Sequence, residues 1–241
     1  KEMVHDSLGR FGTANDDVIE VLKPAKPRCC RIRFKGNFHI DVPCYHLEEE
    51  RDERSLSTED NAWEDSDPKA IYIWFKNKFE ESHRVRFRRL VRYMKAWSAL
   101  KFKDEQGRPS SLLLTVLIAD AVQQLSRDLP AEDDNALEAV LQSILDRLDK
   151  NNRMVPNPVD KDENLAARLT DDEWRAFVEK VESFSKTAAS AVLDENASVA
   201  CSSWAVEFEY LFPLPDTKEL NAQVAKLPAV RTLPEVRVSA I

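Results

Sequence analysis

An early alternation of hydrophobic and polar residues is the most informative pattern in the chain. It comprises two β-rich runs, Arg31–Phe34 and Phe38–His46, separated by the turn Lys35-Gly36-Asn37. This arrangement predicts a β-hairpin. In the second run apolar residues occupy every other position, so Asp41 lies on the opposite face of the strand. A single carboxylate on that face is a candidate metal ligand, although most carboxylates in such positions are only solvated.

Beyond Pro68 the apolar residues recur with a helical period. The pattern predicts helices over Ala70–Glu81, His83–Phe102, Leu112–Leu125, Asp133–Asp149 and from Thr170 to about Asn196. Capping residues support these boundaries: Asp67 precedes Pro68, Ser110 precedes the third helix, and Thr170 with Glu173 forms a capping box. In the second helix Lys95 lies just outside the apolar stripe that faces the core.

These patterns predict an α+β protein of three parts. Residues 1–67 carry the strands, residues 68–212 carry the helices, and residues 213–241 form a proline-punctuated tail. The length of 241 residues is enough to bury a sizeable core. The longest apolar run, Leu112–Ala119, is too short to span a bilayer, and no cleavable signal pattern opens the chain. The cytoplasm is therefore the expected compartment, with no membrane partner.

Charge is unevenly distributed. The chain has 35 Lys and Arg against 43 Asp and Glu, a net charge of −8, which argues against a stable nucleic-acid partner. Ten acids between residues 48 and 67 predict a solvated loop. Between residues 84 and 103 there are eight cations and no acid, so a polyphosphate pocket is expected nearby.

Five short motifs follow one another along the chain. They are Phe38-His39-Ile40-Asp41-Val42-Pro43, Trp63-Glu64-Asp65-Ser66-Asp67-Pro68-Lys69, Tyr93-Met94-Lys95-Ala96-Trp97, Pro109-Ser110-Ser111 and Asn157-Pro158-Val159-Asp160-Lys161-Asp162-Glu163-Asn164-Leu165. In this order they resemble the CD-NTase family, the bacterial nucleotidyltransferases related to cGAS and oligoadenylate synthase that make cyclic oligonucleotide signals.

The resemblance implies a fold and a metal site. The fold is a nucleotidyltransferase-type mixed sheet, of which residues 1–67 supply only the later strands, packed on a C-terminal helical domain of the oligoadenylate-synthase type. Asp41 matches the third of three metal-binding acids, for which Mg²⁺, or alternatively Mn²⁺, is the expected ion. The first two acids of the family follow a Gly-Ser loop, and none of the four glycines here precedes a serine. We expect those acids upstream of Lys1, because Asp41 alone cannot hold a metal pair.

The resemblance also implies nucleotide-binding residues. Lys95 is expected at the triphosphate, as a compact point charge, and otherwise would be a solvated helix lysine. Ser110 is expected at a phosphate, or it only caps a helix. Asn157 matches a position that reads the base edge, since an amide both donates and accepts. Arg31 lies near a family arginine that approaches a nucleotide, and strand pairing explains it equally well.

The first functional interpretation is an Mg²⁺-dependent nucleotidyltransferase. It would join ATP, GTP or both into a cyclic di- or trinucleotide for anti-phage (CBASS) signalling, and would be active only with the missing N-terminal acids. The resemblance also implies a ubiquitin-transfer-like or regulatory partner that binds the tail. A non-catalytic nucleotide- or partner-binding domain is the main alternative. A polymerase acting on RNA ends is a third reading, which the net charge disfavours.

Overall fold

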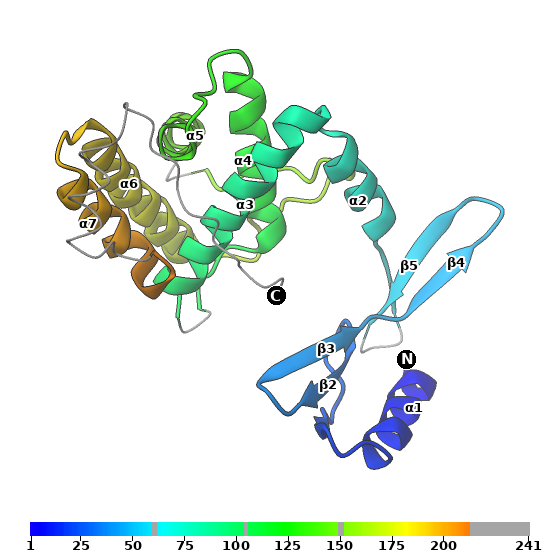
Figure 1. The fold of residues 1–241 in the computed structure, drawn as a ribbon. Helices are drawn as coiled ribbons and strands as arrows, with labels where there is room; N and C mark the ends of the chain where they lie inside the picture. The colour runs from blue at the N-terminus through cyan, green and yellow to red at the C-terminus, as the bar shows by residue number, and fades with distance from the viewer. Residues whose placement is uncertain (59–61, 104–105, 149–151, 213–241) are drawn as a thin grey trace. The chain divides into compact units, whose positions relative to one another are not determined.

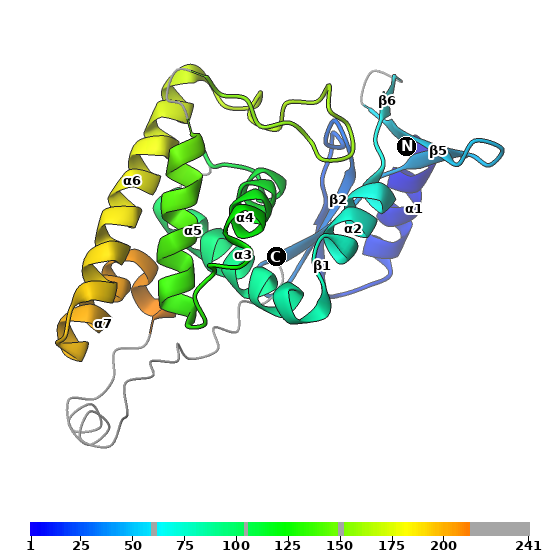
Figure 2. The same ribbon diagram turned by 90° about the horizontal axis from the view of Figure 1, so that it is seen from above.

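The computed structural model describes residues 1–58, 62–103, 106–148 and 152–212, and the chain divides into two compact units at residues 73 and 74 (Figures 1 and 2). The division falls within helix α2 (Pro68–Asn77). The predicted boundary after residue 67 lies immediately before this helix. The predicted tail, residues 213–241, lies outside the described residues. Strands in the first unit and helices in the second confirm the α+β class.

The first unit begins with α1 (Glu2–Thr13) and an antiparallel sheet in the order β1-β2-β3. Its strands are β1 (Val18–Val21), β2 (Cys30–Phe34) and β3 (Phe38–Val42). Positive φ angles of 90° at Gly36 and 61° at Asn37 close the turn between β2 and β3. The predicted hairpin is confirmed, but its second strand ends at Val42, because the next residue, Pro43, has no N–H for the ladder.

The segment rich in acids is not a loop. It contains β4 (Tyr45–Glu48), β5 (Glu53–Ser57) and β6 (Trp63–Asp65), which pair antiparallel in that order. Arginines offset the acidic charge: Arg54 lies 2.6 Å from an oxygen of Asp52, and Arg28 lies 2.8 Å from an oxygen of Glu64. The expectation of a loop was wrong, because backbone pairing between the strands orders these residues despite their charge.

The second unit is a helical bundle. Its helices are α3 (Glu81–Lys101), α4 (Ser111–Leu125), α5 (Asp133–Arg147), α6 (Asp171–Leu193) and α7 (Ala197–Phe208), followed by the short 3₁₀ helix η1 (Glu209–Leu211). Consecutive helices from α3 to α7 pack against one another, and α3 also contacts α5 and α7 (Figure 1). Across the described residues, none of the helices combines the length and the apolar character that a bilayer crossing requires.

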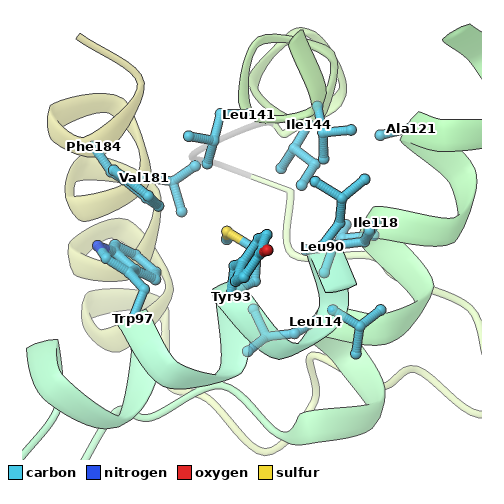
Figure 3. Close-up of a cluster of buried hydrophobic side chains, with 14 of the residues drawn as sticks. Leu90, Tyr93, Trp97, Leu114, Ile118, Ala121, Leu141, Ile144, Val181 and Phe184 are labelled. Carbon is cyan, nitrogen blue, oxygen red and sulfur yellow. The ribbon is translucent and has the colours of Figure 1, made fainter. Parts of the chain in front are cut away.

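The core of the bundle fixes α3 in place. Figure 3 shows Leu90 and Trp97 of α3 facing side chains from α4, α5 and α6. The rings of Trp97 and Phe184 stack with centroids 5.1 Å apart, and both side chains are fully buried. Burial of large aromatic side chains contributes heavily to core stability. Helix α3, which carries the cation-rich segment, therefore packs against a buried hydrophobic core.

The predicted helix caps are confirmed. The side chain of Asp67 accepts a hydrogen bond from the Ala70 amide at 2.9 Å, so this acid serves the start of α2. Thr170 and Glu173 form the reciprocal capping box at the start of α6. Ser110 is the N-cap of α4. Such local bonds explain why the helix starts could be read from the sequence.

Candidate functional site

Arg31 and Asp41 are opposite one another in the ladder between β2 and β3. The guanidinium donates from Nε to Oδ1 at 2.6 Å and from Nη2 to Oδ2 at 2.7 Å, a bidentate ion pair. The hydrogen bonds from Arg31 lower the pKa of the Asp41 carboxyl. His39 adds a ring nitrogen 4.0 Å from Oδ2. The candidate metal acid is therefore ionised and already paired.

The magnesium prediction can be compared with this geometry. Carboxylate oxygens are the ligands that Mg²⁺ prefers, and Asp41 offers two, but Arg31 donates to both. Within the described ranges, no three or more His, Cys, Asp or Glu side chains lie close enough together to hold a metal ion. These residues supply one candidate ligand and do not form a metal site by themselves, so the role of Asp41 in metal binding stays a prediction.

Most cations of the basic segment have structural partners. Arg84 donates to Phe79 O at 3.2 Å, Arg86 to Pro130 O at 2.8 Å and Arg89 to Asp133 at 2.7 Å, while Lys101 and Lys103 each lie 3.2 Å from a carboxylate oxygen, of Glu207 and Glu209 respectively. These five side chains bind neighbouring parts of the second unit. A phosphate bound by any of them would therefore have to share or displace an existing partner.

The remaining three cations, Arg88, Arg92 and Lys95, share one face of α3 because they are spaced by four and three residues. We call this set the α3 cation face. Arg88 is exposed and its guanidinium carbon lies 5.9 Å from the centroid of the Phe75 ring. Arg92 and Lys95 form no hydrogen bond or ion pair with any part of the chain that the structure describes.

Lys95 is half-buried, and burial lowers the pKa of its ammonium group. The sequence placed it beyond the edge of the core stripe, and the structure moves it inward to the border of the core. A cation taken partly out of water without a counter-charge is unfavourable. An anion bound here would remove that cost, so Lys95 has the properties of an anion-binding residue.

Ser110 caps helix α4, which is one of the two roles predicted for it. Its Oγ accepts the amide hydrogen of Leu113 at 3.1 Å. This bond uses an acceptor lone pair of the hydroxyl, which also carries one donor hydrogen. Capping is confirmed, and donation to a phosphate oxygen stays a prediction that the capping bond permits.

Asn157 is buried and its amide is largely occupied. Nδ2 donates to Glu163 Oε2 at 2.5 Å, and Oδ1 accepts from the Val159 amide at 3.0 Å. Asn164 acts in the same way, accepting from the amides of Val155 and Ala166 at 3.0 Å. The polar residues of this motif thus organise their own loop. Base reading by Asn157 stays a prediction, and one amide hydrogen and one lone pair of Oδ1 are left for it.

Asp133 is a residue that the sequence reasoning missed. At the start of α5, it receives two hydrogen bonds of 2.7 Å from Arg89 and one of 2.8 Å from the Tyr93 hydroxyl. Burial and the Asp133 hydrogen bond raise the pKa of Tyr93. The partners are 40 and 44 residues apart in the chain, so no local pattern could have revealed the contact. Asp133 fixes the helix on which Lys95 lies.

The predicted residues fall into two groups. Arg31 and Asp41 are in contact within the first unit, whereas Lys95, Ser110 and Asn157 belong to the second. Over residues 84–210 the chain matches the family model described as cyclic GMP-AMP synthase, C-terminal domain. The chain belongs to this family. The predicted membership of the CD-NTase family is thereby confirmed.

Relatives extend the match to the strands. A cyclic GMP-AMP synthase from Escherichia albertii is 28% identical over 240 residues, which are 99% of this chain and 51% of that protein. The chain thus spans about half the length of this curated relative. Its region of similarity includes the segment that contains Arg31 and Asp41.

Solved structures share the fold. Escherichia coli DncV in its 3′-deoxy GTP bound form has a TM-score of 0.67 and 24% identity, over 85% of this chain and 55% of that one. Vibrio cholerae DncV with the linear intermediate pppA(3′,5′)pG has a TM-score of 0.69 and 20% identity, over 89% of this chain and 59% of that one. The predicted nucleotidyltransferase fold, with only its C-terminal part present, is confirmed.

Proposed function

We propose that the full-length protein is a cyclic dinucleotide synthase that joins ATP, GTP or both in a Mg²⁺-dependent reaction. The observation that carries this proposal is the family match over residues 84–210, inside which Lys95 is half-buried without a counter-charge. The DncV relatives with GTP or a linear dinucleotide bound support nucleotides as the ligand class. A cyclic trinucleotide is the second candidate product.

The chain's own residues take specific roles in this reaction. A ribose hydroxyl releases its proton to solvent and attacks the α-phosphorus of a nucleoside triphosphate. A new O–P bond forms, the bond from the α-phosphorus to the oxygen that bridges to the β-phosphorus breaks, and pyrophosphate leaves with that oxygen. Lys95 balances charge on the triphosphate as a point cation, and the Ser110 hydroxyl donates to a phosphate oxygen. Asn157 contacts a base edge. Bound Mg²⁺ would supply activation of the hydroxyl and neutralisation of the pyrophosphate, with Asp41 contributing one carboxylate.

Arg31 uses one lone pair on each oxygen of Asp41, so a metal bound by that carboxylate would either share it with the guanidinium or displace the guanidinium. The guanidinium has five N–H donors and always carries its charge. It can therefore exchange the carboxylate for a nucleotide phosphate without a change in protonation. This exchange would place Arg31 near a nucleotide, as the family resemblance implies.

The cellular setting belongs to the same proposal. A cyclic nucleotide made in the cytoplasm would act as a signal in CBASS anti-phage defence. A ubiquitin-transfer-like or regulatory protein would bind the tail, residues 213–241, which lie outside the described part of the chain. If deleting the last ten or so residues leaves every conjugate and co-purifying protein unchanged, the tail has no such role.

A non-catalytic nucleotide-binding domain is the second candidate function. It is favoured by the bidentate pairing of Asp41 with Arg31. In that case Asp41 would orient Arg31 toward a nucleotide, and no product would form.

Incubation of the full-length protein with ATP, GTP and Mg²⁺, followed by mass spectrometry, separates the two functions. A cyclic dinucleotide that disappears in Asp41→Asn supports the synthase. Nucleotide binding by calorimetry with no product supports the non-catalytic domain. Equal turnover by wild type and Asp41→Asn would remove the metal assignment, because the substitution keeps side-chain volume and deletes the charge.

A further inference from the structure

Arg92 and Lys95 lie three residues apart on α3, and Arg88 lies four residues before Arg92. Side chains at these spacings are neighbours on a helix surface, and like charges there repel. No acid occurs in the sequence between residues 84 and 103 to offset them. No acid within residues 84–103 therefore offsets the α3 cation face, and Asp133 of α5, which accepts a hydrogen bond from the neighbouring Tyr93, is already paired with Arg89.

Other side chains of α3 bind the neighbouring helices and so fix the position of the α3 cation face. Arg89 and Tyr93 bind Asp133 of α5, and Trp97 donates to the buried Glu207 of α7 at 3.0 Å. These contacts anchor the helix to two neighbours on its other sides. Five of the eight basic residues are used in internal contacts, so the pair Arg92 and Lys95 stands out as the available charge.

We propose that Arg92 is a second phosphate-binding residue beside Lys95, and that the two together bind the polyphosphate of a nucleoside triphosphate. This rests on the proposed function and names a further residue of the same site. The two side chains are complementary, because guanidinium binds two phosphate oxygens as a fork whereas ammonium acts as a compact point charge. Arg92 is exposed and can contact a ligand in solvent, whereas Lys95 is half-buried at the border of the core.

Arg88 provides a matched control. It carries the same charge, lies on the same face one turn earlier, and is also exposed, but its guanidinium packs over the Phe75 ring. If general electrostatic attraction were the only effect, Arg88→Gln and Arg92→Gln would weaken an anion equally. If Arg92 contacts phosphate, its variant alone should show the larger loss.

The experiment uses full-length wild type, Arg92→Gln, Arg92→Lys and Arg88→Gln, with calorimetric titration of inorganic tripolyphosphate, ATP and GTP. Arg92→Gln should weaken all three ligands by about tenfold, the scale of one charge-assisted hydrogen bond. Arg92→Lys should fall between that variant and wild type because it keeps charge and loses the fork. Arg88→Gln should change affinity by less than about twofold, and unliganded melting temperatures should agree within about 2 °C.

Other outcomes overturn the inference. Equal losses in the two glutamine variants would assign the effect to long-range charge. Unchanged tripolyphosphate affinity in Arg92→Gln would show that this arginine is only a solvated side chain. A 20-base-pair RNA duplex serves as a second probe. If the duplex binds more weakly to Arg92→Gln while tripolyphosphate affinity is unchanged, the α3 cation face binds nucleic acid instead. If the protein forms no cyclic product but tripolyphosphate binding still depends on Arg92, the synthase function is rejected and the phosphate-binding role of Arg92 stands.

Discussion

Arg31 donates to both carboxylate oxygens of Asp41, at 2.6 and 2.7 Å, from the position directly opposite in the β2–β3 ladder. The geometry unites two residues that the sequence predicted for separate roles. The pair provides the carboxylate with hydrogen-bond donors from within the hairpin, so the charge state of Asp41 depends on its partner in the neighbouring strand.

The first prediction concerns pH. The pKa of Asp41 is lowered in the folded protein, relative to about 3.9 in an unfolded chain. The ion pair therefore stabilises the fold above that unfolded value, and the contribution is lost as pH falls through the lowered folded pKa. Asp41→Asn should reduce the melting temperature at pH 7 more than at pH 3. A reduction that is the same at both pH values would contradict the pairing.

The hairpin illustrates what the sequence could and could not predict. Alternating residues and the Gly36-Asn37 turn identified β2 and β3, and strand pairing was one of the two explanations given for Arg31. The strands β4 to β6 were missed because the segment that contains them is rich in acids, although Leu56 is buried there. Propensity alone is a weak guide where arginines such as Arg28 and Arg54 offset the charge of nearby acids.

The helical unit was more predictable. Helices α3 to α6 were located within a few residues, because each carries a long run of apolar residues at helical spacing. Two of them, α4 and α6, also begin at a capping side chain, Ser110 and Thr170 respectively. The site residues were not fixed in the same way. Which cations of α3 pair internally depends on contacts such as that of Arg89 with Asp133, 44 residues away in the chain, and local periodicity contains no information about them.

A second prediction separates binding from folding at Lys95. Replacing it with Ala removes a partly desolvated charge and some packing of its aliphatic stem, and these effects oppose one another. The free energy of unfolding should change by less than about 1 kcal/mol. Affinity for ATP and GTP should fall about ten- to a hundredfold, because a charge-assisted bond contributes about 1.5–3 kcal/mol.

Calorimetric titration and thermal melts without ligand measure these two quantities. Lys186→Ala is the matched control, since this lysine is exposed on α6 and should affect neither. Unchanged nucleotide affinity in Lys95→Ala would leave Lys95 with a structural role only.

A third prediction tests the anchor of α3. Asp133→Asn keeps side-chain volume but weakens the bonds from Arg89 and Tyr93, both of which are largely shielded from water. The free energy of unfolding should fall by about 2 kcal/mol, as for hydrogen bonds to a charged group. Asp146→Asn, at an exposed site of the same helix, should change it by no more than about 0.5 kcal/mol. Urea titrations followed by circular dichroism would give both values, and equal values would contradict the anchoring role.

The final prediction separates two roles of Asn157. Its side chain donates to Glu163 at 2.5 Å and accepts from the Val159 amide at 3.0 Å, so Asn157→Ala leaves both groups without this partner. The free energy of unfolding should fall by about 1–3 kcal/mol, the usual cost of a lost partner at a buried site. Glu163→Gln keeps an acceptor oxygen at the same position and should retain most of the stability.

Base reading adds a different signature at the same residue. If the remaining amide hydrogen of Asn157 contacts a base edge, Asn157→Ala should change the ratio of ATP to GTP affinity, because adenine and guanine offer different donors and acceptors on that edge. Glu163→Gln should leave the ratio unchanged. Competition titrations of the two nucleotides, measured at a temperature where both variants remain folded, give the ratio directly. Loss of both affinities by the same factor in Asn157→Ala would assign this residue to loop structure and remove it from base recognition.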